Sequence, residues 1–288
     1  MDLNELRLEI DKIDDQLVRL FVQRMDISAQ IADYKKMNDL PIFVPAREEE
    51  KMRDVAKKAG RDMDVYARVL YDLLFELSRG YQSKCNAART ALFECISAAI
   101  QNTPKLLPKD ATVACMGGDD PNLEMVCRKI FGGCATMPFK SREGALSAVA
   151  QGMCRFGLLP LDDSKKRIYD QLAEHGLYIV RSFRLPGLTQ YVCISRQLEI
   201  YPGSDRSTIR MALSDRPGAL YKVLARLYTL GINVVALESQ PIHQQHFLGM
   251  FYFDLETSVY SEEFVQLMCE LDDLCKNFAY LGSYTEVV

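Results

Sequence analysis

The residue whose chemistry is most unusual for its position in this sequence is Arg24. It stands in an apolar heptad series where a hydrophobic side chain is expected, and a buried cation there must meet an anion. Lys35 follows eleven residues later, which on an α-helix places it within about 20° of the same face and roughly 16 Å along the axis. Two cations placed in this way can bind the two ends of a small anion. Arg7 is rotated by about 100° and points elsewhere, so we expect it to serve the site of a partner chain.

A structural interpretation of Arg24 is the alternative. The cation would then pair with a carboxylate of a neighbouring helix, such as Asp11 or Glu9, and would set the register of the helical seam.

Four further polar residues belong to the same hypothesis. Arg47 and Glu48 open a second predicted helix, and Ser78 and Gln82 stand four residues apart on one face of a third. For the last two, ordinary polar surface is the alternative. Together these groups would line a water-poor pocket with cations, an acceptor and neutral donors, and with no evident nucleophile, metal cluster or histidine base.

A long amphipathic helix at the start of the chain must position the cations. Apolar residues recur at alternating steps of three and four from Leu3 to Tyr34, with no proline or glycine up to Lys36. Such a helix is about 50 Å long, too long for its own small domain to cover. We therefore expect a homodimer, or a higher homo-oligomer, with a partner chain packed on the seam.

Two further helices should complete an all-α domain over residues 1–100. Pro41 and Pro45 end the first helix, and a second helix is predicted over residues 46–59, closed by Gly60. A third is predicted from about residue 64, and its apolar pattern continues more weakly to residue 100. Residues 101–110, which include two prolines, then form a linker.

The rest of the chain is expected to contain two α/β parts. Over residues 111–200, short strand patterns alternate with helical ones, which indicates a single α/β lobe. Residues 201–288 begin with a turn at Pro202-Gly203. Their order of strand, helix, two strands, helix and strand predicts a ferredoxin-like βαββαβ unit. The predicted fold class is multidomain, α followed by α/β.

Composition narrows the class of function. The 288 residues include 35 Lys and Arg against 39 Asp and Glu, and the net charge of -4 argues against a nucleic-acid partner. No apolar stretch approaches the roughly 20 residues of a membrane span, and the N-terminus lacks signal-peptide features, so we expect a cytoplasmic protein. The nine cysteines lack paired metal-ligand spacing and suit reduced, buried thiols. We expect no metal and no cofactor.

The first hundred residues resemble the all-α chorismate mutases. With the family's internal spacings kept from Arg7 to Glu48, the matching positions are Leu6-Arg7, Ile13-Asp14, Arg24, Lys35, Pro41, Arg47-Glu48, Ser78 and Gln82. The resemblance implies an intertwined three-helix dimer that converts chorismate to prephenate. Where the family often has an aspartate four residues before the glutamate, this chain has Val44, so that contact to the substrate hydroxyl would have to come from the backbone.

The same resemblance implies a role for each site residue. Lys35 and Gln82 would donate to the ether oxygen of the substrate, and Glu48 would accept from its ring hydroxyl. The two substrate carboxylates would be bound by Arg7 of the partner chain, Arg24, Arg47 and Ser78. Because the reaction is a unimolecular rearrangement, the pocket needs only to hold the reactive conformer and to stabilise charge as the C–O bond breaks.

Residues 111–200 resemble the dehydratase part of bifunctional chorismate mutase/prephenate dehydratases. Leu159-Pro160-Leu161-Asp162-Asp163-Ser164 is similar to the family's Val-Pro-Ile-Glu-Asn-Ser segment. In Leu188-Thr189-Gln190-Tyr191-Val192, glutamine replaces the arginine of the catalytic Thr-Arg-Phe segment. The early glycine-rich loop survives only as Met116-Gly117-Gly118-Asp119-Asp120, and between Leu185 and Thr189 there is no room for the second lobe that closes the cleft. A dehydratase must protonate a departing hydroxide in a closed site, so we expect this degenerate lobe to be inactive.

The last part of the chain resembles an ACT regulatory domain. The similar segments are Asp215-Arg216-Pro217-Gly218-Ala219-Leu220 and Glu238-Ser239-Gln240-Pro241, the second of which usually reads Glu-Ser-Arg-Pro. In that family, backbone amides at a Gly-Ala-Leu helix start meet an amino acid carboxylate. An L-phenylalanine effector is therefore expected at Asp215, Gly218, Ala219, Leu220, Glu238 and Ser239. A domain kept only for dimerisation is the alternative.

The sequence thus predicts a homodimeric chorismate mutase of phenylalanine biosynthesis with a degenerate dehydratase lobe and an ACT domain. Two other functions stay open: a bifunctional enzyme that also makes phenylpyruvate, and a non-catalytic dimer that senses phenylalanine. Isochorismate pyruvate lyases share the helical fold, but the attached dehydratase and ACT remnants favour the phenylalanine branch.

Overall fold

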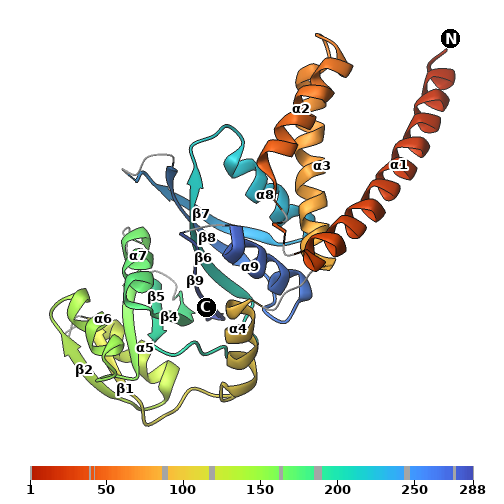
Figure 1. Cartoon of the computed structure of the whole chain (residues 1–288). Helices are drawn as coiled ribbons and strands as arrows, with labels where there is room; N and C mark the ends of the chain where they lie inside the picture. Colours follow the sequence, from red (N-terminus) through yellow and green to blue (C-terminus); the bar gives the residue numbers. More distant parts are fainter. Residues whose placement is uncertain are drawn as a thin grey trace. The chain divides into compact units, whose positions relative to one another are not determined.

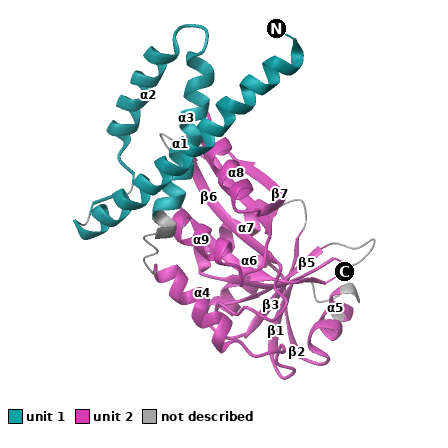
Figure 2. Ribbon diagram, turned by 90° about the vertical axis from the view of Figure 1, so that its right-hand side faces the viewer, with its two compact units in different colours: residues 1–88 teal, residues 89–288 magenta. Residues whose placement is uncertain are grey.

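The computed structural model of the chain divides into two compact units, residues 1–88 and residues 89–288 (Figure 2). It describes residues 2–38, 40–41, 43–85, 90–116, 121–161, 165–184, 190–242, 247–274 and 277–287. Among these described residues, no helix is both long and apolar enough to cross a lipid bilayer.

The first unit consists of three helices, α1 (Leu3–Met37), α2 (Pro45–Ala59) and α3 (Asp64–Cys85), and α3 packs against the other two. A capping box at Asp2 and Glu5 begins α1 by satisfying backbone N–H groups that have no partner within the helix. Pro45 occupies the first position of α2, where its fixed φ suits a helix start. Gly60, with φ 76°, ends that helix in a conformation that favours glycine. The bounds of α1 and α2 agree with those predicted from the periodicity.

The apolar face of α1 is largely uncovered within the chain. Only Ser28 and Ala32 are buried on this helix, and both lie in the C-terminal half, where α1 meets α3 (Figure 1). The N-terminal half diverges from the α2–α3 pair. Its exposed apolar residues include Leu3, Leu6, Ile10, Ile13, Leu17 and Leu20. An apolar stripe of this length on a water-facing helix is typical of a protein–protein contact surface.

The second unit contains a mixed six-stranded sheet in the order β10-β4-β5-β3-β1-β2. Its strands are β1 (Thr112–Met116), β2 (Ala135–Phe139), β3 (Phe156–Leu161), β4 (Tyr178–Phe183), β5 (Gln190–Ser195) and β10 (Glu286–Val287). β1 runs parallel to β2 and β3, whereas β5 is antiparallel to both β3 and β4. The expected α/β lobe is therefore present, with a mixed sheet.

Helices cover both faces of this sheet. α5 (Pro121–Phe131) packs on one face, where Phe156 and Leu158 of β3 point. α6 (Arg142–Ala150) and α7 (Lys165–His175) pack on the other, against Leu159 and Leu161. This alternation along one strand is what a sheet buried on both faces requires.

A second, four-stranded antiparallel sheet has the order β7-β8-β6-β9. Its elements follow one another as β6 (Arg206–Ser214), α8 (Ala219–Thr229), β7 (Asn233–Gln240), β8 (Phe247–Glu256), α9 (Glu262–Leu274) and β9 (Ala279–Tyr284). This βαββαβ order is the one expected from the sequence.

The two sheets of the second unit share a core. Tyr252 and Leu281 of the four-stranded sheet are buried in one cluster with Ile168 and Leu172 of α7. β9 passes so close to β4 that a Cβ on Gly282 would lie 2.3 Å from the carbonyl oxygen of Ile179. Only glycine permits this approach, and its φ of 126° is one that other residues rarely adopt.

The third helix does not continue to residue 100 as expected. α3 ends at Cys85, and a separate helix, α4 (Ala91–Asn102), begins at Thr90, whose hydroxyl accepts from the backbone N–H of Phe93. Ile96 and Ala99 are buried in the core between the four-stranded sheet and α9. The division between units therefore falls at residues 88 and 89, twelve residues before the predicted end of the first domain at residue 100. The further division at residues 200 and 201 stays a prediction.

Candidate functional site

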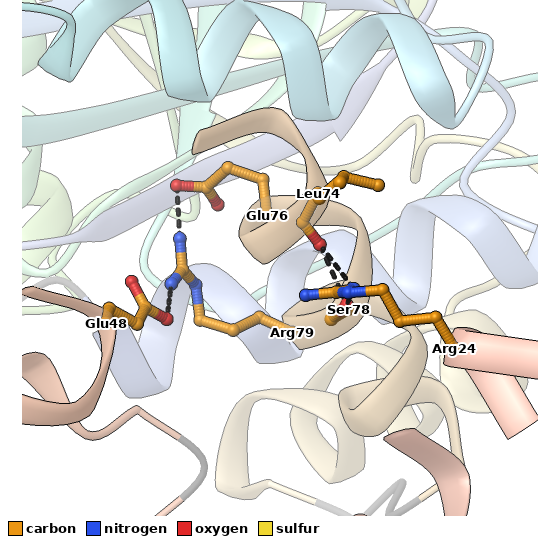
Figure 3. Close-up of polar contacts among 6 residues, drawn as sticks. All are labelled: Arg24, Glu48, Leu74, Glu76, Ser78 and Arg79. Atoms are coloured by element: carbon orange, nitrogen blue, oxygen red, sulfur yellow. Dashed lines mark hydrogen bonds and ion pairs between the residues drawn. The ribbon is translucent and has the colours of Figure 1, made fainter. Parts of the chain in front are cut away.

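Arg24 projects from α1 toward α3 and is half-buried. Its Nη1 donates to the carbonyl oxygen of Leu74, at 3.1 Å, and to the hydroxyl of Ser78 (Figure 3). These partners are neutral, so the expected alternative of an ion pair with Asp11 or Glu9, both exposed, is not what the structure shows. Burial lowers the pKa of Arg24, and Tyr71 and Glu48 oppose that shift. The positive charge is thus held in place without being neutralised by its hydrogen-bond partners.

Lys35 lies on the same helix and is partly buried. Burial lowers the pKa of its ammonium group, and the nearby Glu48 partly offsets the effect. Glu48, in the first turn of α2, thus raises the pKa of both Arg24 and Lys35 against the effect of burial.

Ser78 and Gln82, one turn apart on α3, are both buried. The hydroxyl of Ser78 donates to the carbonyl oxygen of Leu74 at 2.7 Å, so that Ser78 accepts from Arg24 while it donates within its own helix. Gln82 is only 7% exposed, and its Oε1 has no hydrogen-bond partner in the described part of the chain. A buried amide left in this state is costly unless a ligand or a partner chain completes its hydrogen bonds.

Arg79, which the sequence analysis did not single out, contacts Glu48 of this cluster. Its guanidinium forms ion pairs with Glu48 of α2 and with Glu76 one turn earlier on α3, and Figure 3 shows it between the two carboxylates. It also lies over the ring of Phe43, 5.1 Å from the centroid. The i, i+3 spacing of Glu76 and Arg79 is visible in the sequence. The contact with Glu48 depends on how α2 packs on α3.

Three predicted site residues are not brought to this cluster within one chain. Arg7 is exposed on α1, seventeen residues and so about 25 Å before Arg24. Arg47 is exposed and pairs with Glu50, at 2.7 Å between Nη1 and Oε2. Val44 is exposed at the start of α2, where it makes no side-chain cap.

In the second unit, Gln190 is held in a polar network. Its Nε2 donates to Ser182 Oγ at 2.8 Å and to Glu286 Oε1 at 3.0 Å, while its own Oε1 accepts from Arg184 at 3.3 Å. The side chain at the position expected for a catalytic arginine is therefore committed to neighbours on β4 and β10. The rest of the predicted dehydratase segments falls partly on residues 117–120, 162–164 and 185–189, which lie outside the described residues.

The thiol of Cys193 on β5 is fully buried, and this burial strongly raises its pKa. A thiol kept protonated in the core is a poor nucleophile, and its burial fits the reduced, buried thiols expected from the sequence.

The predicted effector segments lie at the start of α8 and on β7. Gly218 has a left-handed φ of 84° where α8 begins, Asp215 is exposed, and Ala219 and Leu220 are partly buried. Glu238 is partly buried on β7, and the carbonyl oxygen of Ser239 accepts from Lys166 of α7 at 3.2 Å.

These groups define a class of site. The site contains two cations from α1, a carboxylate from α2, and a hydroxyl and an amide from α3, a set of groups that suits a small anion with hydrogen-bonding oxygens. Among the described residues, no cluster of metal-ligating side chains is present.

Comparison with known proteins shows what each part of the chain is similar to. Residues 6–83 match the family model of chorismate mutase type II, so the first unit is a chorismate mutase type II domain. The whole chain is 24% identical to the bifunctional chorismate mutase/prephenate dehydratase of Aquifex aeolicus (strain VF5), over 99% of that protein. That alignment spans 362 positions and the chain has 288 residues, so at least 74 positions are gaps in this chain.

Two further relatives match parts of the chain. The bifunctional chorismate mutase/prephenate dehydratase of Escherichia coli (strain K12) is 32% identical over 79 residues, which are 27% of this chain and 20% of that protein. A solved prephenate dehydratase from Arthrobacter aurescens, in complex with L-Phe, superposes on 60% of this chain and 89% of its own, with a TM-score of 0.53 and 15% identity. This last likeness establishes a shared fold for the second unit.

Proposed function

We propose that this protein is a chorismate mutase, which rearranges chorismate to prephenate in aromatic amino acid biosynthesis. The observation that carries the proposal is the set of Arg24, Lys35, Glu48, Ser78 and Gln82 in the part of the chain that matches chorismate mutase type II, with Arg24 held on the hydroxyl of Ser78. The substrate is a dicarboxylate with an ether oxygen and a ring hydroxyl, and each of these groups has a complement in the cluster.

The site would act by holding one conformer and stabilising charge. Arg24 and Ser78 bind a carboxylate, and Lys35 and Gln82 donate to the ether oxygen as negative charge develops there. Glu48 accepts from the ring hydroxyl, a contact that Val44 cannot supply with its side chain. A unimolecular rearrangement needs no nucleophile, and preorganised donors are sufficient for a large rate enhancement.

The active form is proposed to be a homodimer. The exposed apolar residues of α1 need a partner, and Arg7 lies too far from Arg24 on the same helix to serve its own site. A second copy of α1 would cover the seam and bring its Arg7 to the pocket, where Arg47 could turn from Glu50 to complete carboxylate binding.

The α/β lobe is proposed to lack dehydratase activity. The side-chain amide of Gln190 is hydrogen-bonded to Ser182, Arg184 and Glu286, so it is not free to bind a substrate. The gaps in the alignment with the Aquifex protein are on the scale of a missing lobe, without which the lobe present has no second wall to exclude water. A bifunctional enzyme is the alternative.

The βαββαβ part is proposed to be an ACT domain that binds L-phenylalanine. α8 begins at the left-handed Gly218 and has no side-chain cap there, which is the kind of helix start that can bind a carboxylate. A fold shared with a dehydratase solved in complex with L-Phe supports this assignment.

One assay with product identification tests these functions together. Purified protein is incubated with chorismate, and then separately with prephenate, and the products are resolved by chromatography. Prephenate formed from chorismate, with no phenylpyruvate from either substrate, is the expected result. Formation of phenylpyruvate would establish the bifunctional alternative, and release of pyruvate would indicate a lyase. If chorismate is not consumed, the protein is not a mutase, and the non-catalytic phenylalanine-sensing dimer becomes the favoured function.

A further inference from the structure

Arg79 differs from Arg24 in how its charge is used. Its side chain is 12% exposed and forms ion pairs with two carboxylates, Glu48 and Glu76 (Figure 3). Arg24, in contrast, donates to the neutral oxygens of Leu74 and Ser78. A guanidinium already shared by two carboxylates has little attraction left for a third anion. Arg79 is therefore poorly suited to bind a substrate carboxylate and well suited to hold a protein carboxylate.

The contacts of Arg79 tie the start of α2 to α3. The guanidinium reaches from α3 to Glu48 in the first turn of α2, and it lies over the ring of Phe43, which precedes that helix. Glu76 holds the other side of the same group, so the guanidinium is fixed from both ends. Glu48 is thus held where it influences Arg24 and Lys35.

We propose that Arg79 is a positioning residue for the mutase reaction, which fixes the carboxylate of Glu48 for the ring hydroxyl of the substrate. The inference rests on the proposed function. A carboxylate has several acceptor positions, so one oxygen of Glu48 can bind Arg79 while acceptor capacity remains for the hydroxyl. Because Val44 supplies no carboxylate, this contact depends on Glu48, and its placement depends on Arg79.

A double-mutant cycle tests the assignment. Kinetics on chorismate are measured for wild type, Arg79→Met, Glu48→Gln and the double variant, with melting temperatures for each. Arg79→Met should lower kcat/KM by about tenfold to a hundredfold, since a misplaced group of the site has effects of this size. In the Glu48→Gln background, the same substitution should change kcat/KM by less than about threefold, because coupled residues are not additive. Arg79→Lys, which keeps the charge, should recover part of the activity.

Arg68→Met is the matched control. Arg68 is on the same helix and pairs with Asp64 at 3.6 Å, but it is more exposed. This variant should keep wild-type kinetics. If Arg79→Met does not fold, the cycle is run with Arg79→Lys.

Each other outcome has a distinct meaning. If the wild-type protein does not convert chorismate, the proposed mutase function itself is contradicted. An active wild type with an equally active, folded Arg79→Met variant would overturn the positioning role. Equal losses from Arg79→Met in the wild-type and Glu48→Gln backgrounds would also overturn it, because they would show that Arg79 acts independently of Glu48.

Discussion

At the scale of single residues, the protonation of Lys35 sets the expected pH dependence. An ammonium group donates hydrogen bonds only while it is protonated, so activity is present below the pKa of Lys35 and is lost as the pH rises through it. Burial lowers this pKa, with Glu48 as a smaller opposing influence. The alkaline loss of activity should therefore occur at a lower pH than the titration of an exposed lysine.

Lys35→Ala should reduce kcat by about 10² to 10³-fold, the usual effect of removing one donor to developing negative charge. Lys35→Arg, if active, should shift the alkaline limb upward, because a guanidinium stays protonated throughout. The measurements are kcat as a function of pH and circular dichroism for folding. Lys36→Ala, at an exposed position beside it, is the control. Wild-type turnover in folded Lys35→Ala would contradict the role of Lys35.

Gln82→Glu should convert a pH-independent donor into a titrating one. The amide of Gln82 donates at any pH, whereas a carboxyl group donates only when it is protonated. The variant should be most active at acid pH and lose activity as the pH rises through the pKa of the introduced carboxyl group. A profile of kcat/KM against pH checks this, with Gln101→Glu at an exposed site as the control. An unchanged profile would place Gln82 away from the ether oxygen.

At the scale of elements, the apolar face of α1 has a testable role in assembly. Leu17 is 54% exposed in the single chain, so a charge there has little effect on the fold of one chain. Leu17→Glu should dissociate the dimer and abolish the mutase activity, because a charge cannot be buried on the seam without a partner. Light scattering and the chorismate assay measure both effects. Gln23→Glu, about 120° around the helix, should remain dimeric. A wild-type protein that is monomeric and fully active would contradict the proposed role of α1 in dimerisation.

Arg7 should act in the site of the partner chain. Chains carrying Arg7→Ala and chains carrying Lys35→Ala are each expected to be inactive as homodimers. Unfolded together and refolded, they should form heterodimers with one intact site, and about a quarter of wild-type activity should return if half the dimers are mixed. Native mass spectrometry establishes that the heterodimer exists. No recovered activity in a verified heterodimer would show that Arg7 does not cross the interface.

Elements with strong periodicity were predictable, and contacts between elements were not. The bounds of α1 and α2 follow from apolar spacing, proline and glycine, which act locally along the chain. The hydrogen-bond partners of Arg24 could not be predicted, because the sequence does not show whether a carboxylate or a backbone carbonyl of a neighbouring helix lies opposite the guanidinium. The pairing of Arg79 with Glu48 was missed for the same reason: thirty-one residues separate them, and only the packing of α2 on α3 joins them.

At the scale of the whole molecule, L-phenylalanine should bind the second unit and raise its stability. A ligand that binds only the folded state adds about 2.7 kcal/mol at one hundred times its Kd. Calorimetry and thermal melting with millimolar L-phenylalanine test this, with D-phenylalanine as the control. Regulation further requires that the effector distinguish two states of the protein, so mutase activity is assayed in parallel. If L-phenylalanine, tyrosine and tryptophan give no heat of binding and no change in melting temperature, the alternative of a domain kept only for dimerisation is favoured.

The order of strands and helices in the last part of the chain was predictable from the sequence, but the pairing of its last strand was not. The strand periods of β6 to β9 predicted a βαββαβ part, and the structure shows that order. β10 has two residues, Glu286 and Val287, too few to show any period, and it exists as a strand only because β4 is beside it. α4 was assigned to the wrong unit because its apolar pattern continues that of α3, and only its burial against α9 places it.

The pairing of β10 with β4 has a consequence for how the protein is made. β4 leaves the ribosome about a hundred residues before β10, so the sheet of the α/β lobe keeps an open edge until the entire βαββαβ segment has been translated. At about 5–20 residues per second, the roughly 200 residues of the second unit take on the order of 10–40 s to synthesise. The three helices of the first unit are complete before this interval begins. During translation, α1 of a nascent chain is therefore available to the proposed partner chain while the second unit is still unfinished.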